Sequence, residues 1–208
     1  MGTFTVGITG GSGSPYTLKV VSALLELGHK VIIVSSKAGK RVLEIESDFL
    51  LEGTLENQLS AWQKQLNLNS TNATGLTILD ENDYAASIAS GSSNSLGMVV
   101  VPCSMGSLAR IANGISSSLI ERAADVMIKE KRKLILVTRE APLSVIHINN
   151  MLKLAEIGVE ILPASPGFYH KPKTLEDLVN FIASRILDRL GVPNNLVPRW
   201  NGPTTEEK

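Results

Sequence analysis

The sequence predicts an α/β fold in which a parallel sheet lies between two layers of helices, forming a three-layer sandwich. Short, β-branched apolar runs alternate with longer stretches of helical periodicity, a pattern typical of parallel strands joined by crossover helices. Three of these runs, 4–8, 98–101 and 134–137, each lead into a short polar loop and then a helix-like stretch. Ligands of parallel sheets bind where the carboxyl ends of the strands meet such loops.

The first half of the chain alternates clearly as far as residue 46. Pro15 suits the first turn of a helix and Gly28 the position after its end, so a helix is predicted between them. The segment 48–95 is less regular, with a polar stretch at 67–74 and a Ser/Gly loop at 89–93. The predicted elements are a strand over 3–8, a helix over 15–27, a strand over 30–34, a helix ending near 46, a helix over 55–66 and a strand over 76–79.

Regular alternation resumes in the second half. The predicted elements are a strand over 97–101, helices over 104–112 and 117–131, a strand over 134–138, a helix over 143–157, a strand over 159–162 and a helix over 174–190. We find no internal repeat and no domain boundary, so residues 1–191 are predicted to form a single domain. The tail, 192–208, contains three prolines and a charged end, and we expect it to be disordered or to wrap a neighbour.

Composition limits the classes of function. The 208 residues carry 20 basic and 20 acidic side chains with no basic stripe, which argues against a nucleic-acid partner. The one cysteine, Cys103, and the absence of a signal-like or membrane-spanning apolar run indicate a cytoplasmic protein away from membranes. The three histidines have no ligand spacing, so no metal site is predicted.

Two of the polar loops are small and rich in hydroxyl groups. The loop 9–13 contains Gly10, Gly11 and Ser12, and the loop 102–107 contains Ser104 and Ser107. Bare N–H groups and hydroxyls at the start of a helix can hold a phosphate. The glycines could equally make a tight turn, and Ser104 could be an ordinary helix cap. The spacing matches neither the dinucleotide fingerprint nor the P-loop.

The third loop places a fixed positive charge beside a carboxylate. Arg139 and Glu140 directly follow a predicted buried strand. A phosphate next to Glu140 would raise the pKa of its carboxyl, so Glu140 could carry a proton near neutral pH. A surface ion pair is the plainer interpretation. Arg122 and Lys129 lie two turns apart on one predicted helix, where a phosphate clamp and a solvated face explain them equally well.

Many short blocks in the same order make the chain resemble the UbiX-type flavin prenyltransferases. The resemblance extends from Val6 to Trp200, nearly the whole chain. Its carriers are Gly10-Gly11-Ser12-Gly13, Glu46-Ser47-Asp48, Ser90-Gly91-Ser92, Pro102-Cys103-Ser104, Glu121-Arg122-Ala123-Ala124-Asp125-Val126, Lys129-Glu130, Arg139-Glu140-Ala141-Pro142-Leu143, Ile146-His147, Asn150-Met151, Pro166-Gly167-Phe168-Tyr169-His170 and Arg199-Trp200.

The resemblance implies a Rossmann-like, flavodoxin-like sheet that binds FMN, in a homo-dodecamer with each site at a subunit interface. Members of the family transfer a dimethylallyl group from dimethylallyl monophosphate to N5 and C6 of reduced FMN. The product, prenylated FMN, serves UbiD-type decarboxylases, including the one in ubiquinone biosynthesis. No metal takes part, which agrees with the lack of any Asp-Asp pair in this chain.

Site residues follow from the resemblance by position. FMN would contact Gly10, Gly11, Ser12, Ser36, Ser104, Met105, Gly106, Ser107 and Arg139. The prenyl phosphate would contact Lys129, Glu140, Tyr169 and Arg185, with Tyr84 and Ser90 also on the substrate side and Glu46 and Arg122 close by. Tyr84 stands where some members have tryptophan. In this arrangement fixed cations and the Tyr169 hydroxyl stabilise the departing phosphate, while Glu140 delivers the proton.

Two other functions remain open from the residues. An FMN-dependent cysteine decarboxylase of the same fold class would need an early histidine base, and before residue 53 the chain offers only His29. A non-catalytic flavin carrier for a decarboxylase is the second alternative. A carrier would not explain the presence of four charged residues, Glu46, Lys129, Glu140 and Arg185.

Overall fold

A six-stranded, fully parallel sheet organises the molecule. The computed structural model describes residues 1–200 and 202, and the strand order is β3-β2-β1-β4-β5-β6. The strands are β1 (Thr3–Ile8), β2 (Lys30–Ser35), β3 (Leu76–Leu79), β4 (Ser95–Cys103), β5 (Lys133–Thr138) and β6 (Glu160–Pro163). The predicted α/β class is confirmed. Since the strand order reverses between β1 and β4, the crevice for a ligand lies outside their carboxyl ends.

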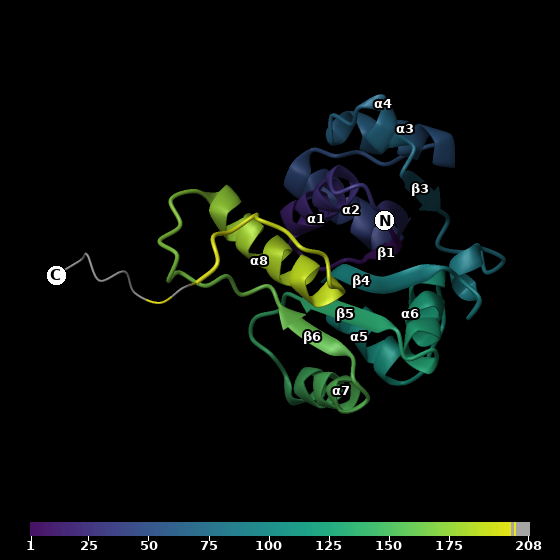
Figure 1. Cartoon of the computed structure of the whole chain (residues 1–208). Helices are drawn as coiled ribbons and strands as arrows, with labels where there is room; N and C mark the ends of the chain where they lie inside the picture. Colours follow the sequence, from purple (N-terminus) through teal and green to yellow (C-terminus); the bar gives the residue numbers. More distant parts are fainter. Residues whose placement is uncertain (201, 203–208) are drawn as a thin grey trace.

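Helices cover both faces of the sheet (Figure 1). One layer contains α1 and α8, and the other contains α5, α6 and α7. The helices are α1 (Ser14–Glu26), α2 (Lys37–Ser47), α3 (Leu55–Gln65), α4 (Ser70–Ala73), α5 (Met105–Ala112), α6 (Leu119–Lys129), α7 (Val145–Glu156) and α8 (Leu175–Leu190), with a 3₁₀ turn, η1, at Ser87–Ala89.

The central strands supply residues to two separate cores. Along β4, Val99 and Val101 join the core beneath α1 and α8, whereas Met98 and Val100 join the core beneath α5 and α6. Alternate side chains of a strand point to opposite faces, so a strand buried on both faces appears in the sequence as one continuous apolar run. Such runs made the central strands predictable.

Local capping fixes where the helices begin. Ser36, Ser104, Ser118 and Thr174 each immediately precede a helix, and each side chain accepts a hydrogen bond from a backbone N–H of the first turn. These caps satisfy N–H groups that have no partner inside the helix. Three of the caps, those of α2, α5 and α6, lie at the carboxyl edge of the sheet beside the crevice.

The expected boundaries differ from the structure mainly in the segment 48–95. The polar stretch 67–74 contains the short helix α4, whose cap is Asn69. The Ser/Gly loop begins as the 3₁₀ turn η1, which packs against α6. Strand β4 starts at Ser95, two residues earlier than predicted, because the backbone of Ser95 pairs with Thr3 of β1, and the Ser95 hydroxyl also contacts that of Thr5.

The tail was expected to be disordered or to wrap a neighbour. Residues 192–200 are ordered against their own chain, and the contact with a neighbour stays a prediction. Val192 and Asn194 are buried, and Asn194 donates to the carbonyl of Ser184 on α8. Arg199 forms two 2.7 Å contacts with the carboxylate of Asp188. The rest of the predicted tail, 201 and 203–208, lies outside the described residues. Within the described part of the chain, no helix is both long and apolar enough to cross a membrane.

Candidate functional site

A polar cavity of about 460 Å³ lies at the carboxyl edge of the sheet, beside the point where the strand order reverses. Its walls come from the ends of β1, β2, β3 and β4 and from the N-terminal ends of α2, α5 and α6. The lining residues are Thr9, Gly10, Ser36, Lys37, Ala38, Glu81, Ser104, Ser107, Arg110, Ser117, Ser118, Ile120 and Glu121. Four of the predicted flavin-binding residues, Gly10, Ser36, Ser104 and Ser107, are therefore brought together here.

The glycines of the first loop allow close packing as well as an open backbone. A Cβ at Gly10 would lie 2.9 Å from the Cβ of Ala38, and one at Gly11 would lie 3.2 Å from Pro102. Both contacts are tighter than ordinary van der Waals distance. A side chain at Gly10 would push the first loop away from the start of α2, so this glycine fixes one wall of the cavity.

Glu46 reaches the same loop from the far end of α2. Its Oε2 accepts hydrogen bonds of 2.9 Å from the N–H groups of Gly13 and Ser14, at the start of α1. Burial raises the pKa of Glu46, but hydrogen bonds from Ser12, Ser14 and Gly13 outweigh it and hold the pKa below its ordinary value. Glu46, predicted to be close to the reaction, is a carboxylate that orders the Gly10–Ser12 loop.

The start of α5 presents free donors to the cavity. Ser104 N–H donates to Thr9 Oγ1 at 2.7 Å, which fixes the turn between β4 and α5. The next two N–H groups, of Met105 and Gly106, have no acceptor among the described residues. Met105, Gly106 and Ser107 were all predicted to contact the flavin. An anion placed here would complete the first turn of the helix.

Cys103 takes no part in this site. Its side chain is fully buried, and that burial raises the pKa of the thiol to about 12. A thiol that stays protonated is a poor nucleophile. The structure therefore supports Cys103 as a small core residue at the end of β4. Among the described residues there is also no group of three histidine, cysteine, aspartate or glutamate side chains that could hold a metal ion.

Two residues of the cavity wall were missed as site residues at the sequence level. Glu121 of α6 is 3% exposed and forms an ion pair with Arg110 of α5. The Ser118-x-x-Glu121 spacing resembles a capping box, in which the glutamate would bond the backbone of its own cap. Instead, its carboxylate accepts hydrogen bonds from Ser117 and Arg110. Arg110 had no distinguishing motif, since its role depends on the approach of α5 to α6.

Arg139 and Glu140 follow β5 at the same edge of the sheet. Both are exposed, and from the described residues Glu140 accepts only the neighbouring N–H of Ala141, at 3.2 Å. Arg139 has no hydrogen-bond or ion-pair partner among the described residues. The two side chains are thus available to a ligand or to another subunit.

Tyr169 and Arg185 lie farther along the sheet, around β6. The ring of Tyr169 makes edge contacts with Phe181 and Trp200, at centroid distances of 5.8 and 5.5 Å. Phe181 and Arg185 both line a separate cavity of about 450 Å³ between β6 and α8. Arg185 also approaches Asp188 at 3.4 Å, so it shares that carboxylate with Arg199.

Lys129, Arg122 and Ser90 form a second group on α6 and on the segment beside it. Arg122 donates to the carbonyl of Ala89 at 3.1 Å, and Lys129 pairs with Glu130 next to Gly91. Tyr84 is exposed in the loop that follows β3 and leads to this segment. None of these side chains contacts Glu140, Tyr169 or Arg185 within the described chain.

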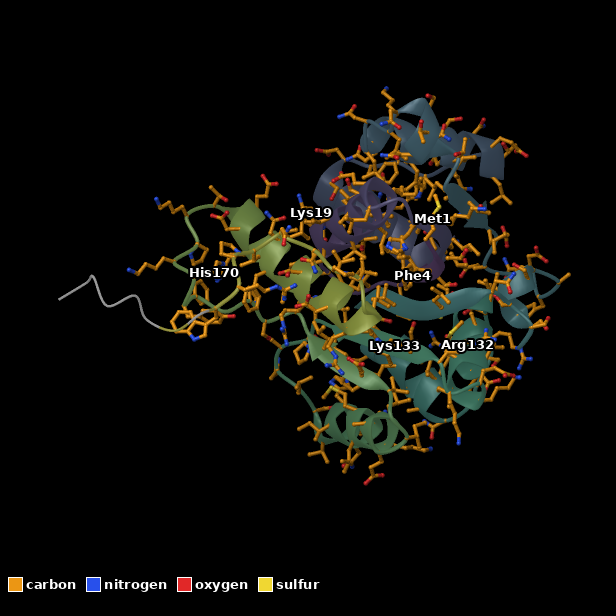
Figure 2. All side chains as sticks on the ribbon, viewed as in Figure 1. Met1, Phe4, Lys19, Arg132, Lys133 and His170 are labelled. Carbon is orange, nitrogen blue, oxygen red and sulfur yellow. The ribbon has the colours of Figure 1, made fainter. Side chains whose placement is uncertain are left out.

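The group around Lys129 and the group around Tyr169 lie at different edges of the molecule. Helix α6 begins at the cavity, where Leu119 N–H donates to the carbonyl of Glu81, and runs about 16 Å to Lys129. Beyond its end, Arg132 donates to the carbonyls of Gly91 and Ser93, just before β4 begins. In Figure 2, Arg132 and His170, the neighbour of Tyr169, appear on opposite sides of the molecule. One chain alone therefore does not assemble all of the predicted prenyl-phosphate ligands.

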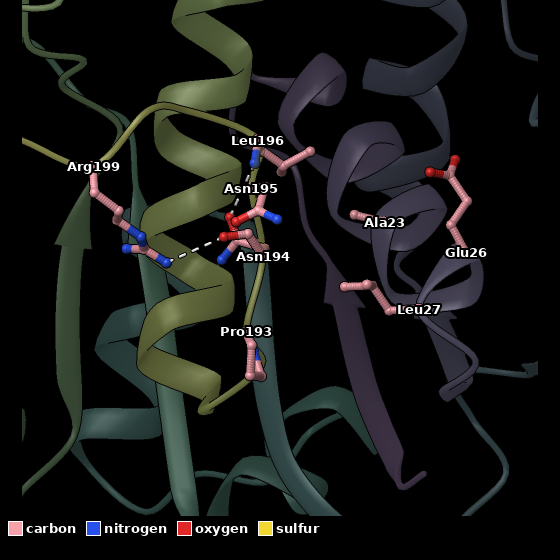
Figure 3. Close-up of a pocket in the computed structure, with 8 residues that line it drawn as sticks. All are labelled: Ala23, Glu26, Leu27, Pro193, Asn194, Asn195, Leu196 and Arg199. Atoms are coloured by element: carbon pink, nitrogen blue, oxygen red, sulfur yellow. Dashed lines mark hydrogen bonds between the residues drawn. The ribbon is translucent and has the colours of Figure 1, made fainter.

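Another cavity, of about 540 Å³, contains none of the predicted site residues. It lies between α1 and residues 193–199 of the tail and is shown in Figure 3. Arg199 at its rim is already paired with Asp188 and with the carbonyl of Asn194. The cavity is remote from the carboxyl ends of β1 and β4, and we assign it no role in the chemistry.

Comparison with known proteins identifies the family. The family model described as Flavoprotein matches residues 2–187. The flavin prenyltransferase UbiX of Alkalihalophilus pseudofirmus is 48% identical over 94% of this chain and 94% of its own length. The UbiX of Pseudomonas aeruginosa is 45% identical over 94% of this chain and 92% of its own.

Solved structures agree. AnUbiX (PadA1), crystallised with FMN and dimethylallyl pyrophosphate, has a TM-score of 0.86 at 36% identity, covering 98% of this chain and 99% of its own. A dodecameric FMN-dependent UbiX-like decarboxylase from Escherichia coli has a TM-score of 0.84 at 37% identity, covering 96% and 100%. An FMN-dependent cysteine decarboxylase, TvaF, is only 14% identical, which shows a shared fold alone. The chain belongs to the UbiX flavin prenyltransferase family of flavoproteins.

Proposed function

We propose that this protein transfers a dimethylallyl group from dimethylallyl monophosphate to N5 and C6 of reduced FMN, and that the prenylated flavin serves a UbiD-type decarboxylase in the cytoplasm. The observation that carries the proposal is the cavity at the carboxyl ends of β1 and β4, which combines unpartnered helix N–H groups, hydroxyls and an arginine. These groups suit the phosphate of a mononucleotide. Membership of the flavin prenyltransferase family supports the other parts of the proposal, namely the prenyl donor and the flavin atoms that receive the dimethylallyl group.

The chain offers FMN a continuous set of contacts along the sheet edge. Ser36 follows β2 and Arg139 follows β5, three strand spacings apart, or about 14 Å. The enclosed hydroxyl-rich end suits the phosphate, and the exposed Arg139 end suits the ring. Ser104–Ser107 would join Ser36 around the phosphate, and Gly10, Gly11 and Ser12 would contact the molecule between the two ends. Reduced FMN supplies the nucleophilic atoms, and the surrounding residues bind and orient it.

The side chains around β5 and β6 can assist departure of the phosphate. Arg185 provides a fixed positive charge, Tyr169 a hydroxyl donor and Glu140 a carboxyl whose pKa a nearby phosphate would raise. Donors aimed at a developing oxyanion in an enclosed site are typically worth about 3–4 kcal/mol each. Proton delivery by Glu140 would neutralise part of the charge of the departing monophosphate, in addition to the charge of Arg185 and the hydroxyl of Tyr169.

We further propose that each site is completed by another copy of the chain. Lys129, Arg122 and Ser90 lie away from Glu140 and Tyr169 in one chain, so they can act on the same phosphate only across an interface. A dodecameric relative supports such an assembly, and we propose the same oligomeric state here. Arg139 and Glu140, exposed and without partners beyond their own loop, are suited to an interface position.

A direct assay tests the reaction. The purified protein is incubated anaerobically with reduced FMN and either dimethylallyl monophosphate or the diphosphate, and the flavin is analysed by mass spectrometry. We expect a flavin enlarged by one dimethylallyl group, formed from the monophosphate. If FMN binds tightly but never gains this mass with either donor, the transferase proposal is refuted in favour of a flavin carrier.

Subunit complementation tests the shared site. Lys129→Ala and Tyr169→Ala should each be inactive alone, whereas co-expressed variants should regain activity. In a randomly mixed oligomer about one quarter of the shared sites would have both residues intact. If both residues came from the same chain, every site would lack one of them, and the mixture would stay inactive.

A further inference from the structure

The carboxylate of Glu121 is buried in the wall of the cavity and pairs with Arg110. It is 3% exposed, and all of its described contacts are donors: Arg110 Nε at one oxygen, and the N–H and hydroxyl of Ser117 at the other, at 2.8 and 2.6 Å. A buried ion is tolerated only when it is fully paired and hydrogen-bonded. This set of contacts therefore locks the orientation of Arg110 relative to α6.

Arg110 keeps donors that face the cavity. Its Nε is taken by Glu121, and its Nη2 donates to the Ser107 hydroxyl at 3.2 Å. A guanidinium has five N–H groups in a fixed plane, so three remain. The side chain is 42% exposed, and a Cβ at Gly106 would lie only 3.5 Å from Nη1. Nη1 thus lies over the first turn of α5, next to Gly106.

At the two neighbouring helix ends the first N–H group is already occupied. The first N–H of α2, that of Lys37, donates to the Glu81 carboxylate at 2.9 Å. The first N–H of α6, that of Leu119, donates to the Glu81 carbonyl at 2.7 Å. Within the described part of the chain, α5 presents two unpartnered first-turn N–H groups together with a fixed guanidinium, so an anion in this cavity has its best-equipped position beside Arg110.

We infer that Arg110 binds the phosphate of FMN and that Glu121 is a positioning residue that presents its guanidinium. The inference rests on the proposed function and deepens it. A guanidinium held along its Nε edge offers its opposite edge to two phosphate oxygens, the geometry in which arginine binds phosphate most strongly. Glu121 lies on the other edge, with its charge satisfied by three donors, so it orients the arginine without meeting the phosphate.

The test compares FMN with riboflavin, which lacks the phosphate. Binding of each to the full-length protein is measured by quenching of flavin fluorescence. The wild type should prefer FMN. Arg110→Gln should lower FMN affinity about tenfold or more and leave riboflavin affinity unchanged, because one charge-assisted contact is lost. Arg110→Lys should recover part of the preference by restoring the charge alone. Glu121→Gln should shift the FMN-to-riboflavin ratio in the same direction.

A matched control removes a different arginine. Arg41 of α2 is an exposed arginine that pairs with Glu44, so Arg41→Gln should leave the ratio unchanged. If Arg110→Gln keeps the wild-type ratio, the inference fails and the proposed function stands. A wild type that binds neither flavin refutes both. Since Glu121→Gln alters a buried ion pair and can impair folding, the Arg110 variants decide the result on their own.

Discussion

Glu46→Gln is the most informative single substitution for the loop that holds the flavin. The carboxylate accepts the N–H groups of Gly13 and Ser14, each at 2.9 Å, and a hydrogen bond from Ser12. Hydrogen bonds to charged groups contribute about 1.5–3 kcal/mol and neutral ones about 0.5–1.5. Replacing the charge removes about 1 kcal/mol per bond, and solvent screening at this exposed position reduces the total to about 1 kcal/mol.

The effect has a defined pH dependence. The pKa of Glu46 is lowered in the folded protein, so the unfolded chain takes up its proton first as the pH falls. The stabilisation is therefore complete above the ordinary glutamate pKa, near 4.3, and disappears as the pH falls through the lower folded value. Glu46→Gln should be less stable than the wild type at pH 7, and the difference should vanish in acid.

Urea unfolding of both proteins at pH 7 and at pH 3, at equal protein concentration, measures this difference. Glu44→Gln provides the control, since Glu44 lies on the same helix in an exposed pair with Arg41 and should contribute less than about 0.5 kcal/mol. Equal stability of Glu46→Gln and the wild type at pH 7 would refute the reasoning. A deficit that persists unchanged in acid would show that packing, not charge, is responsible.

Three further substitutions separate binding from turnover. Glu140→Gln should retain FMN but lose at least about 100-fold in rate, as expected for a general acid, and an unchanged rate would remove Glu140 from the mechanism. Arg139→Ala should weaken FMN binding, seen as loss of yellow colour on purification; full flavin content would contradict its assignment. Asp188→Asn should release Arg199 and Arg185 together and raise KM for the prenyl phosphate up to about fivefold, with FMN affinity unchanged. An unaltered KM would show that Asp188 does not position Arg185.

The central fold could be predicted because its signals are local. Strand β1 over 3–8 and strand β3 over 76–79 begin and end as predicted, and α1 is displaced by one residue at each end. Apolar runs, Pro15 and Gly28 carry that information within a few residues. The short helix α4 could not be found in this way, because its polar sequence buries nothing and only the Asn69 cap marks its start.

The site was predictable where a loop follows a strand and unpredictable where side chains meet across the fold. Gly10, Ser36 and Ser104 converge because parallel strands end at one edge. The contact of Glu46 with Gly13 joins residues 33 positions apart, and the Arg110–Glu121 pair depends on how two helices pack. Nothing local in the sequence records either contact. The separation of Lys129 from Glu140, in contrast, follows from the predicted elements, because Lys129 precedes the strand over 134–138 and Glu140 follows it.

The position of Trp200 against Tyr169 has a practical consequence for handling the protein. Any group attached to Trp200 would lie beside the ring that we expect to meet the prenyl phosphate. Met1 is fully exposed ahead of β1, at the amino edge of the sheet. Purification handles, fluorophores and surface tethers are therefore best attached there.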